Sequence, residues 1–273
     1  MSLVLGLAQS GFPANGDVLS QVDSFAKRAR DRHVDLLVFP ENLMCPHEQS
    51  VSDLVETAQP TDGPFVHGMC QIARRLSLWI VFTMYEANPT GMQPFNTAVV
   101  VDNTGSVRDT YQKCHLYDAH GVRESSRMSA GNELCHAIRT PFGTLGIGIC
   151  YDLRFPETAR HLALCGCELL LFPAAWHDGR NKAQHWETLL RARAIENECF
   201  VAGVCHGGKR YVRQSHVFDP MGNELAVGKD DLLVCNVDLG AVKVARDAMP
   251  IFDHRRPELY VSREGATQRV FPS

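Results

Sequence analysis

The sequence predicts an α/β fold, a four-layer αββα sandwich built as a single domain over residues 1–273 with two pseudo-equivalent halves. The main observation is an internal repeat: Asp35-Leu-Leu-Val-Phe-Pro40 and Glu168-Leu-Leu-Leu-Phe-Pro173 are near copies, each a short apolar run closed by proline. An amphipathic helix precedes each copy, and another apolar strand precedes each helix. Helices covering one face of each sheet, with the two sheets packed on each other, bury all of these apolar faces.

The first half supplies its elements in the order strand, helix, strand, helix, strand, and then a strand pair. The turn residues Asp102-Asn-Thr-Gly105 join the last two strands. The expected elements are a strand over residues 1–9, a helix with Leu19, Val22, Ala26 and Ala29 on one face, a strand over 35–39, a helix with Phe65, Met69, Ile72 and Leu76 on one face, and strands at Trp79–Tyr85, Phe95–Val101 and Val107–Gln112.

The second half repeats this order. Its turn is Asp219-Pro-Met-Gly222, the counterpart of the turn in the first half. The expected elements are a strand over Leu145–Ile149, a helix opened by Phe155-Pro156-Glu157, a strand over 168–173, a helix with Trp186, Leu189, Leu190 and Arg193 on one face, and strands at Phe200–Cys205, Val212–Phe218 and Glu224–Val227.

Composition excludes several classes of protein. The 27 Lys and Arg against 31 Asp and Glu give a net charge of −4, and no basic stripe is present, so we expect no nucleic-acid partner. No apolar run approaches the roughly 18 residues of a membrane span, and ten cysteines without a signal peptide indicate reduced thiols in the cytoplasm. The ligand spacings of structural zinc are missing, so we expect no metal.

The two halves differ at the ends of matching strands, and this is where we expect chemistry. The first copy of the repeat ends in Glu41 where the second has Ala174, and the strand that ends near Gln9 in the first half ends in Cys150 in the second. Ligands of open α/β sheets usually bind beyond the carboxyl ends of the strands. Each half therefore contributes one reactive side chain to the predicted site.

Cys150 stands in a turn between a strand and a helix, as in a nucleophile elbow. Gly146 and Gly148 permit close backbone approach, and the positive end of the following helix should favour a thiolate. The alternative is a buried structural cysteine, which is what most of the ten must be.

Three charged residues complete the predicted centre. Glu41 follows an apolar strand, where an unpaired charge would be costly. Lys113 leaves the end of a hairpin strand and can pair with Glu41 or stabilise an oxyanion, and Glu124 can hold its ammonium. For each of these side chains the alternative is an ordinary solvated surface charge.

Three segments resemble motifs of the nitrilase superfamily of carbon–nitrogen hydrolases: Phe39-Pro-Glu-Asn42, Tyr111-Gln-Lys-Cys-His-Leu-Tyr117 and Gly148-Ile-Cys-Tyr-Asp-Leu-Arg-Phe-Pro-Glu157. Each contains one member of that family's Glu-Lys-Cys triad, in the right order. The resemblance implies an αββα sandwich, a homodimer or higher homo-oligomer that extends the stack across a helical interface, and no cofactor or metal.

Within the superfamily, the chain most resembles the deaminated glutathione amidase branch. The residues concerned are His115-Leu-Tyr-Asp-Ala119, Glu124-Ser-Ser-Arg127 and Ser129-Ala-Gly-Asn-Glu133, and Glu124 matches the family's second glutamate. The resemblance is also close to the omega-amidases that act on 2-oxoglutaramate. Nitrilases carry Trp where this chain has Tyr151, which disfavours a nitrile substrate.

The expected reaction is cleavage of a small anionic amide through a thioester, with release of ammonia. Glu41 takes the thiol proton of Cys150, while Lys113 and the backbone N–H of Tyr151 hold the oxyanion. A cleft that binds an anion needs cations and a wall for contact. The candidates for substrate binding are Arg123, Arg127, Arg154, Trp176 and Arg180.

Two other functions remain open. A papain-like Cys-His hydrolase would use His115, His177 or His206 as base, although its local signature around the cysteine is absent. From a different class, the chain could be a catalytically idle scaffold or a thiol redox sensor.

Overall fold

In the computed structural model, which describes residues 2–45, 50–90, 93–228 and 230–259, two six-stranded sheets form the centre of the molecule. Met1 of the predicted first strand and residues 260–273 of the predicted domain lie outside the described residues. The first sheet has the order β14-β1-β2-β3-β4-β5. Its strands are β14 (Leu232–Asp238), β1 (Ser2–Ala8), β2 (Leu36–Val38), β3 (Trp79–Glu86), β4 (Phe95–Val101) and β5 (Val107–Gln112).

The second sheet has the order β13-β12-β11-β10-β9-β8. Strands β9, β10 and β11 run parallel to one another, as β1, β2 and β3 do in the first sheet. In each sheet two antiparallel strands follow, β12 and β13 in the second sheet and β4 and β5 in the first. The strands are β8 (Ile138–Thr140), β9 (Gly143–Ile147), β10 (Leu169–Ala174), β11 (Phe200–Cys205), β12 (Ser215–Phe218) and β13 (Glu224–Gly228).

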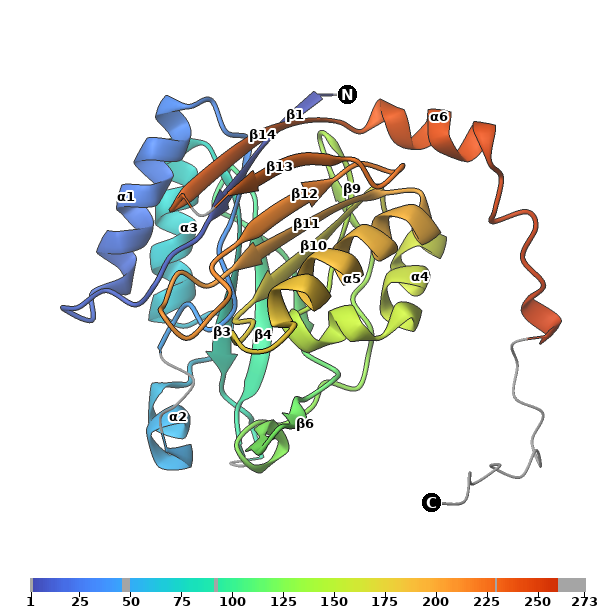
Figure 1. Ribbon diagram of the computed structural model, residues 1–273. Coiled ribbons are helices and arrows are strands. Elements are labelled where there is room, and N and C mark those ends of the chain that lie inside the picture. The colour runs from blue at the N-terminus through green and yellow to red at the C-terminus, as the bar shows by residue number, and fades with distance from the viewer. Residues whose placement is uncertain (1, 46–49, 91–92, 229, 260–273) are drawn as a thin grey trace, which may run out of the picture.

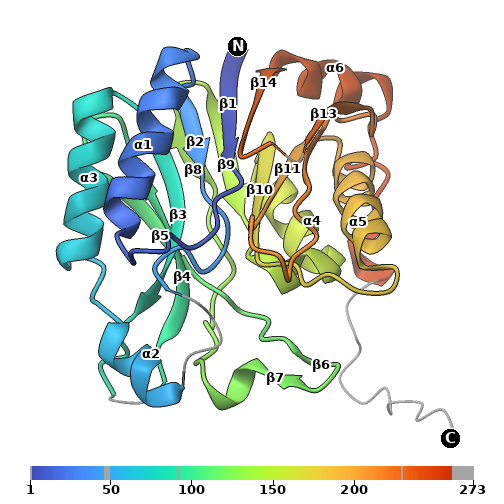
Figure 2. The same ribbon diagram turned by 60° about the vertical axis from the view of Figure 1, so that its left-hand side comes forward.

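Helices cover the outer face of each sheet, so the four layers lie in the order helices, sheet, sheet, helices (Figures 1 and 2). The first sheet is covered by α1 (Val18–Asp31) and α3 (Pro64–Leu76), and the second by α4 (Pro156–Leu164) and α5 (Lys182–Asn197). The αββα sandwich predicted from the sequence is the observed fold. Its remaining elements are α2 (Val51–Thr57), β6 (Asp118–Ala119), β7 (Val122–Arg123), α6 (Gly240–Ala248) and the 3₁₀ helices η1 (Glu124–Ser126), η2 (Cys150–Arg154) and η3 (Pro257–Leu259).

Strand β1 shows how the layers divide the apolar side chains. Leu3, Leu5 and Leu7 are buried in a core shared with β9 and β10 of the second sheet. The intervening Val4 and Ala8 pack in a separate core with α1 and α3. Successive side chains of a strand point to opposite faces, so one strand contributes to both cores.

The predicted strands and helices are present, but two strands differ in their bounds. The strand expected over Leu145–Ile149 is β9, which runs from Gly143 to Ile147. The strand expected over Val212–Phe218 begins only at Ser215. The N–H of Val212 donates to the carbonyl of Trp176 at 2.9 Å and so pairs with a loop rather than with the sheet. Strand β14 and helix α6 were not predicted, although β14 pairs with β1 along its full length and completes the first sheet.

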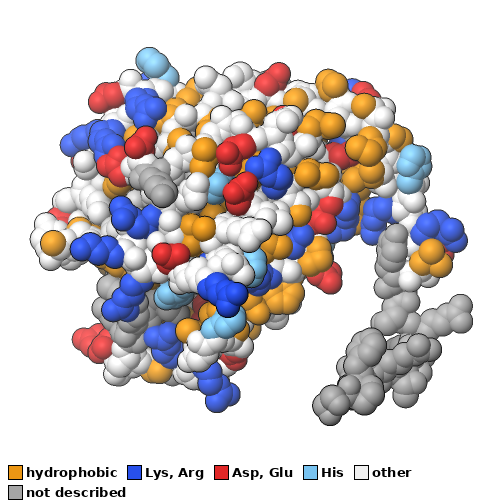
Figure 3. All heavy atoms as spheres, viewed as in Figure 1, with side chains coloured by type: hydrophobic (Ala, Val, Ile, Leu, Met, Phe, Trp, Pro, Cys, Tyr) orange, Lys and Arg blue, Asp and Glu red, His pale blue; other side chains and the backbone are white. Residues whose placement is uncertain are grey.

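No helix in the part of the chain that the structure describes is long and apolar enough to cross a bilayer. Apolar side chains do reach the surface along α5 and α6, where Ile195 is 47% exposed and Val244 70% exposed. Figure 3 shows hydrophobic atoms gathered over the α6 end of the molecule. Assembly into a homodimer or larger homo-oligomer stays a prediction.

Candidate active site

A cavity of about 500 Å³, its open mouth included, lies beyond the ends of β2, β9 and β10. The loop that carries β6 and β7 lies beneath the ends of the two sheets (Figure 2). The cavity is lined by Glu41, Asn42, Lys113, Tyr117, Val122, Glu124, Cys150, Tyr151, Arg154, Ala175, Trp176, His177 and Lys182. The structure therefore brings together the thiol, the two carboxylates and the ammonium that the sequence singles out.

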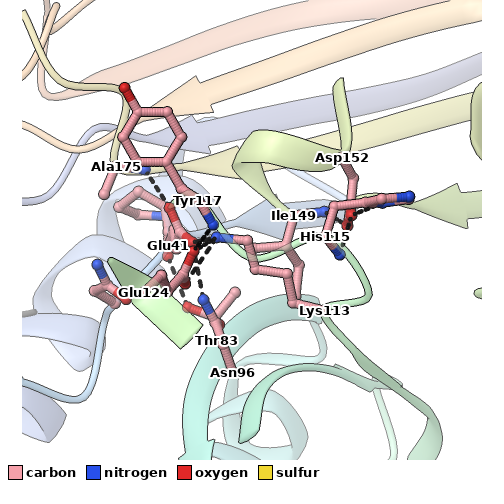
Figure 4. Close-up of polar contacts among 12 residues, drawn as sticks. Glu41, Thr83, Asn96, Lys113, His115, Tyr117, Glu124, Ile149, Asp152 and Ala175 are labelled. Carbon is pink, nitrogen blue, oxygen red and sulfur yellow. Dashed lines mark hydrogen bonds and ion pairs between the residues drawn. The ribbon is translucent and has the colours of Figure 1, made fainter. Parts of the chain in front are cut away.

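Glu41 is buried, and each of its carboxylate oxygens has fixed donors (Figure 4). Oε1 accepts hydrogen bonds from Lys113 Nζ and Asn96 Nδ2, both at 2.8 Å, and Oε2 accepts one from the backbone N–H of Ala175 at 2.9 Å. Burial by itself raises the pKa of Glu41, but the Lys113 charge and the hydrogen bonds outweigh it and hold the pKa at about 2. Glu41 is thus an oriented carboxylate at neutral pH.

Lys113 lies between two carboxylates. Its Nζ is 2.8 Å from Glu41 Oε1 and 2.9 Å and 3.0 Å from the two oxygens of Glu124. Burial lowers the pKa of Lys113, but the two carboxylates raise it well above its ordinary value. Glu124 is itself held by the N–H of Tyr117, which donates to Oε2 at 2.6 Å. The buried ammonium therefore remains charged and fixed in position.

Cys150 occupies the predicted elbow, as the first residue of η2 shortly after the end of β9. Its φ of 45° is in the left-handed region, which non-glycine residues adopt rarely and which is common at functional turns. A Cβ added at Gly148, just after β9, would lie 2.6 Å from the ring of Phe172, so the absence of a side chain at Gly148 leaves room for that ring. The strand end thus presents the sulfur to the cavity.

The expectation that the helix end would favour a thiolate is wrong. Burial, followed by the charge of Glu41, raises the pKa of the Cys150 thiol well above its ordinary value, and Lys113 opposes this only in part. Cys150 and Glu41 line the same cavity, and each shifts the pKa of the other. The resting pair is therefore a thiol beside a carboxylate, and attack by sulfur requires a base.

Asp152 is a structural partner of the site that the sequence reasoning missed. This fully buried carboxylate accepts hydrogen bonds from the N–H of Ile149 at 2.8 Å and the hydroxyl of Tyr111 at 2.8 Å. It also contacts His115, through the backbone N–H at 3.2 Å and Nδ1 at 2.7 Å. Asp152 thereby ties the elbow to the segment that carries Lys113 (Figure 4).

Two of the five residues proposed for substrate binding, Arg154 and Trp176, line the cavity. Their side chains form a cation–π pair, with Arg154 Cζ 4.8 Å from the Trp176 ring. The structure does not place Arg123, Arg127 or Arg180 on the cavity wall. In β7 successive side chains alternate, so Val122 faces the cavity while Arg123 is exposed, and Arg180 is exposed in the loop before α5.

The three histidines considered as bases of a Cys-His hydrolase differ in position. His177 lines the cavity, whereas His115 pairs with Asp152 and stacks on Phe155 at 3.7 Å. Burial lowers the pKa of His206 to about 4, and the nearby Glu41 charge only partly offsets this. Within the described ranges, no cluster of three or more His, Cys, Asp or Glu side chains could hold a metal ion.

Comparison with known proteins places the chain in a family. A model described as carbon–nitrogen hydrolase matches residues 7–247. The deaminated glutathione amidase of Escherichia coli O157:H7 is 33% identical over 235 residues, which are 85% of this chain and 89% of that protein. The Bos taurus deaminated glutathione amidase is 35% identical over 219 residues, covering 74% of this chain and 66% of that one.

The structural comparison agrees. The crystal structure of the Caenorhabditis elegans NitFhit protein, at 31% identity, has a TM-score of 0.86 over 95% of this chain and 66% of that chain. Since the family model spans most of the sequence and relatives above 30% identity cover most of it, the chain belongs to the carbon–nitrogen hydrolase family of the nitrilase superfamily.

Proposed function

We propose that the chain is a cysteine amidase that cleaves a linear amide through a thioester on Cys150, with Glu41 as general base and acid. The observation that carries this proposal is that Cys150 and Glu41 line the same cavity, where Glu41 is ion-paired to buried Lys113 at 2.8 Å. A nucleophile next to an oriented base is the arrangement that covalent catalysis requires.

In the first step the proton moves from sulfur to Glu41 as sulfur attacks the carbonyl carbon. Negative charge leaves the carboxylate and arrives on the carbonyl oxygen, so the total charge of the site does not change. This concerted transfer avoids a free thiolate, which the raised pKa of Cys150 makes costly. Lys113 and the N–H of Tyr151, in the first turn of η2, are the donors proposed for the oxyanion.

Collapse of the tetrahedral intermediate breaks the C–N bond, and Glu41 returns the proton to the departing nitrogen. A water molecule then enters and loses a proton to Glu41 while its oxygen attacks the thioester carbonyl. The C–S bond breaks, the acid product forms and the proton returns to sulfur. One carboxylate thus serves both halves of the reaction.

The substrate we propose is deaminated glutathione, which follows the names of the relatives. Its acyl half is 2-oxoglutarate and its leaving group is the amine of cysteinylglycine, so its cleavage does not release the ammonia that the sequence analysis expects. Ammonia is released from the alternative substrate, 2-oxoglutaramate. Both substrates give the same acyl-enzyme and the same 2-oxoglutarate.

The experiment that tests the proposal measures 2-oxoglutarate release by the wild type, Cys150→Ala and Glu41→Gln. We expect loss of all turnover in the first variant and a loss of about 10³-fold or more in kcat/KM in the second, since the groups act as a unit. Cys165→Ala, which changes an exposed cysteine, is the matched control and should retain wild-type activity.

Mass spectrometry of the protein mixed with substrate adds a direct readout, an acyl adduct on Cys150. Activity that persists in Glu41→Gln and disappears on replacement of His177 would instead support a Cys-His hydrolase. No adduct and no turnover, together with reversible oxidation at scattered cysteines, would support a redox sensor.

A further inference from the structure

Two cations of the cavity have no carboxylate partner among the described residues. Arg154 and Lys182 both line the cavity, and neither forms an ion pair within the described part of the chain. In contrast, the third cation of the cavity, Lys113, is bound by two carboxylates. The proposed acyl group brings a single carboxylate, so one cation is left over.

Aromatic side chains hold both cations in place. Arg154 lies over the Trp176 ring at 4.8 Å. Lys182 Nζ lies 5.2 Å from the centre of the Tyr117 ring and donates a hydrogen bond to its hydroxyl at 3.1 Å. The Trp176 Nε1–H donates to the carbonyl of Lys182 at 2.9 Å, which ties the start of α5 to the other cation–π pair. Both positive charges are therefore positioned in advance of binding.

The cations outside the cluster of Glu41, Lys113 and Glu124 favour a substrate with more than one carboxylate. Lys113 lies within 3.0 Å of both glutamates, so Arg154 and Lys182 are the two lining cations without a carboxylate partner among the described residues. A substrate with one carboxylate neutralises one exposed cation and leaves the other facing the ligand without a partner. A dianionic amide satisfies both.

The two cations lie on different elements, and this suggests which half of the substrate each one binds. Arg154 belongs to η2, the short helix that begins with Cys150, so it stays beside the acyl group throughout the thioester stage. Lys182 begins α5 and is half-buried at the cavity wall formed with Tyr117. We propose that Lys182 binds a carboxylate on the leaving amine and thereby selects peptide-like amides over primary amides.

This inference rests on the proposed function, and the test uses three substrates. They are deaminated glutathione, the same compound with its C-terminal carboxylate converted to a carboxamide, and 2-oxoglutaramate. The variants are Lys182→Met, which keeps the apolar stem and removes the charge, and Lys243→Met on the exposed face of α6 as the control. The readout is kcat/KM for 2-oxoglutarate release.

For the wild type we expect the free acid to exceed its carboxamide by about tenfold, the value of one charge-assisted contact. Lys182→Met should lose about tenfold on the free acid, keep its activity on 2-oxoglutaramate and no longer distinguish acid from carboxamide. Lys243→Met should behave as the wild type. Turnover of 2-oxoglutaramate by Lys182→Met also shows that this variant is folded.

Two results would overturn the inference while leaving the amidase proposal intact. One is a wild-type enzyme that hydrolyses these amides without preferring the free acid, and the other is a Lys182→Met variant that loses activity equally on all three. Absence of turnover on every substrate by the wild type would overturn both proposals.

Discussion

At the scale of single residues, the site pairs a thiol that keeps its proton, Cys150, with a carboxylate that has lost its proton, Glu41. The pKa of Glu41 is lowered to about 2, so the carboxylate is present at every pH above that value. The pKa of Cys150 is raised, so the thiol proton is present throughout the neutral range. The fraction of enzyme that has both an ionised Glu41 and a protonated Cys150 is therefore constant between these limits. We therefore expect kcat/KM for 2-oxoglutaramate to be flat from about pH 5 to about pH 8, where an unperturbed histidine titrates.

Initial rates at low substrate concentration across this range are the measurement. A Cys-His pair would instead give an acidic limb as its imidazole titrates. An acidic limb near pH 6 to 7 that disappears in a His177→Asn variant would rule out Glu41 as the base.

At the scale of elements, Asp152 joins η2 to the segment after β5. Its carboxylate faces hydrogen-bond donors from Ile149, Tyr111 and His115, so an amide in its place would direct an N–H group at other N–H groups. For Asp152→Asn we expect a loss of stability of about 1–3 kcal/mol, typical of a buried group without its partner. We also expect kcat/KM to fall at least tenfold, because Cys150 and Lys113 are positioned through the two joined segments.

Urea unfolding and steady-state kinetics on the same preparation separate the two effects. Tyr111→Phe, which removes one of the donors and leaves the carboxylate, is the matched comparison and should be milder on both counts. Wild-type kinetics in Asp152→Asn would show that the hydrogen bonds of Asp152 do not position the catalytic groups.

At the scale of the whole molecule, the two sheets share one core, so neither can unfold without the other. Leu5 of β1 is fully buried against side chains of the second sheet. We expect Leu5→Ala to lower the free energy of unfolding by about 2–5 kcal/mol. Far-UV and near-UV circular dichroism during urea unfolding should show a single transition, shifted to lower urea in the variant. A first transition that removes only part of the helical signal would mean that the halves unfold independently.

The sequence was sufficient for elements whose pattern is local. The duplicated apolar run with its proline located β2 and β10, and the heptad-like spacing of Leu19, Val22, Ala26 and Ala29 located α1. It was insufficient for β14, whose burial alternates irregularly and whose place beside β1 is fixed by pairing across more than two hundred residues. Such pairing leaves no local signal.

For the site, the order of residues alone identifies the chemical groups: a cysteine at a strand end, a glutamate after a matching strand, and a lysine and a second glutamate in the segment between. Their charge states and their partners follow from the folded arrangement instead, because a pKa depends on burial and on neighbours that come from other parts of the chain. This is why the thiolate expectation failed and why Asp152 was missed. The same reason separates Arg154 and Lys182, which line the cavity, from Arg123 and Arg180, which are exposed.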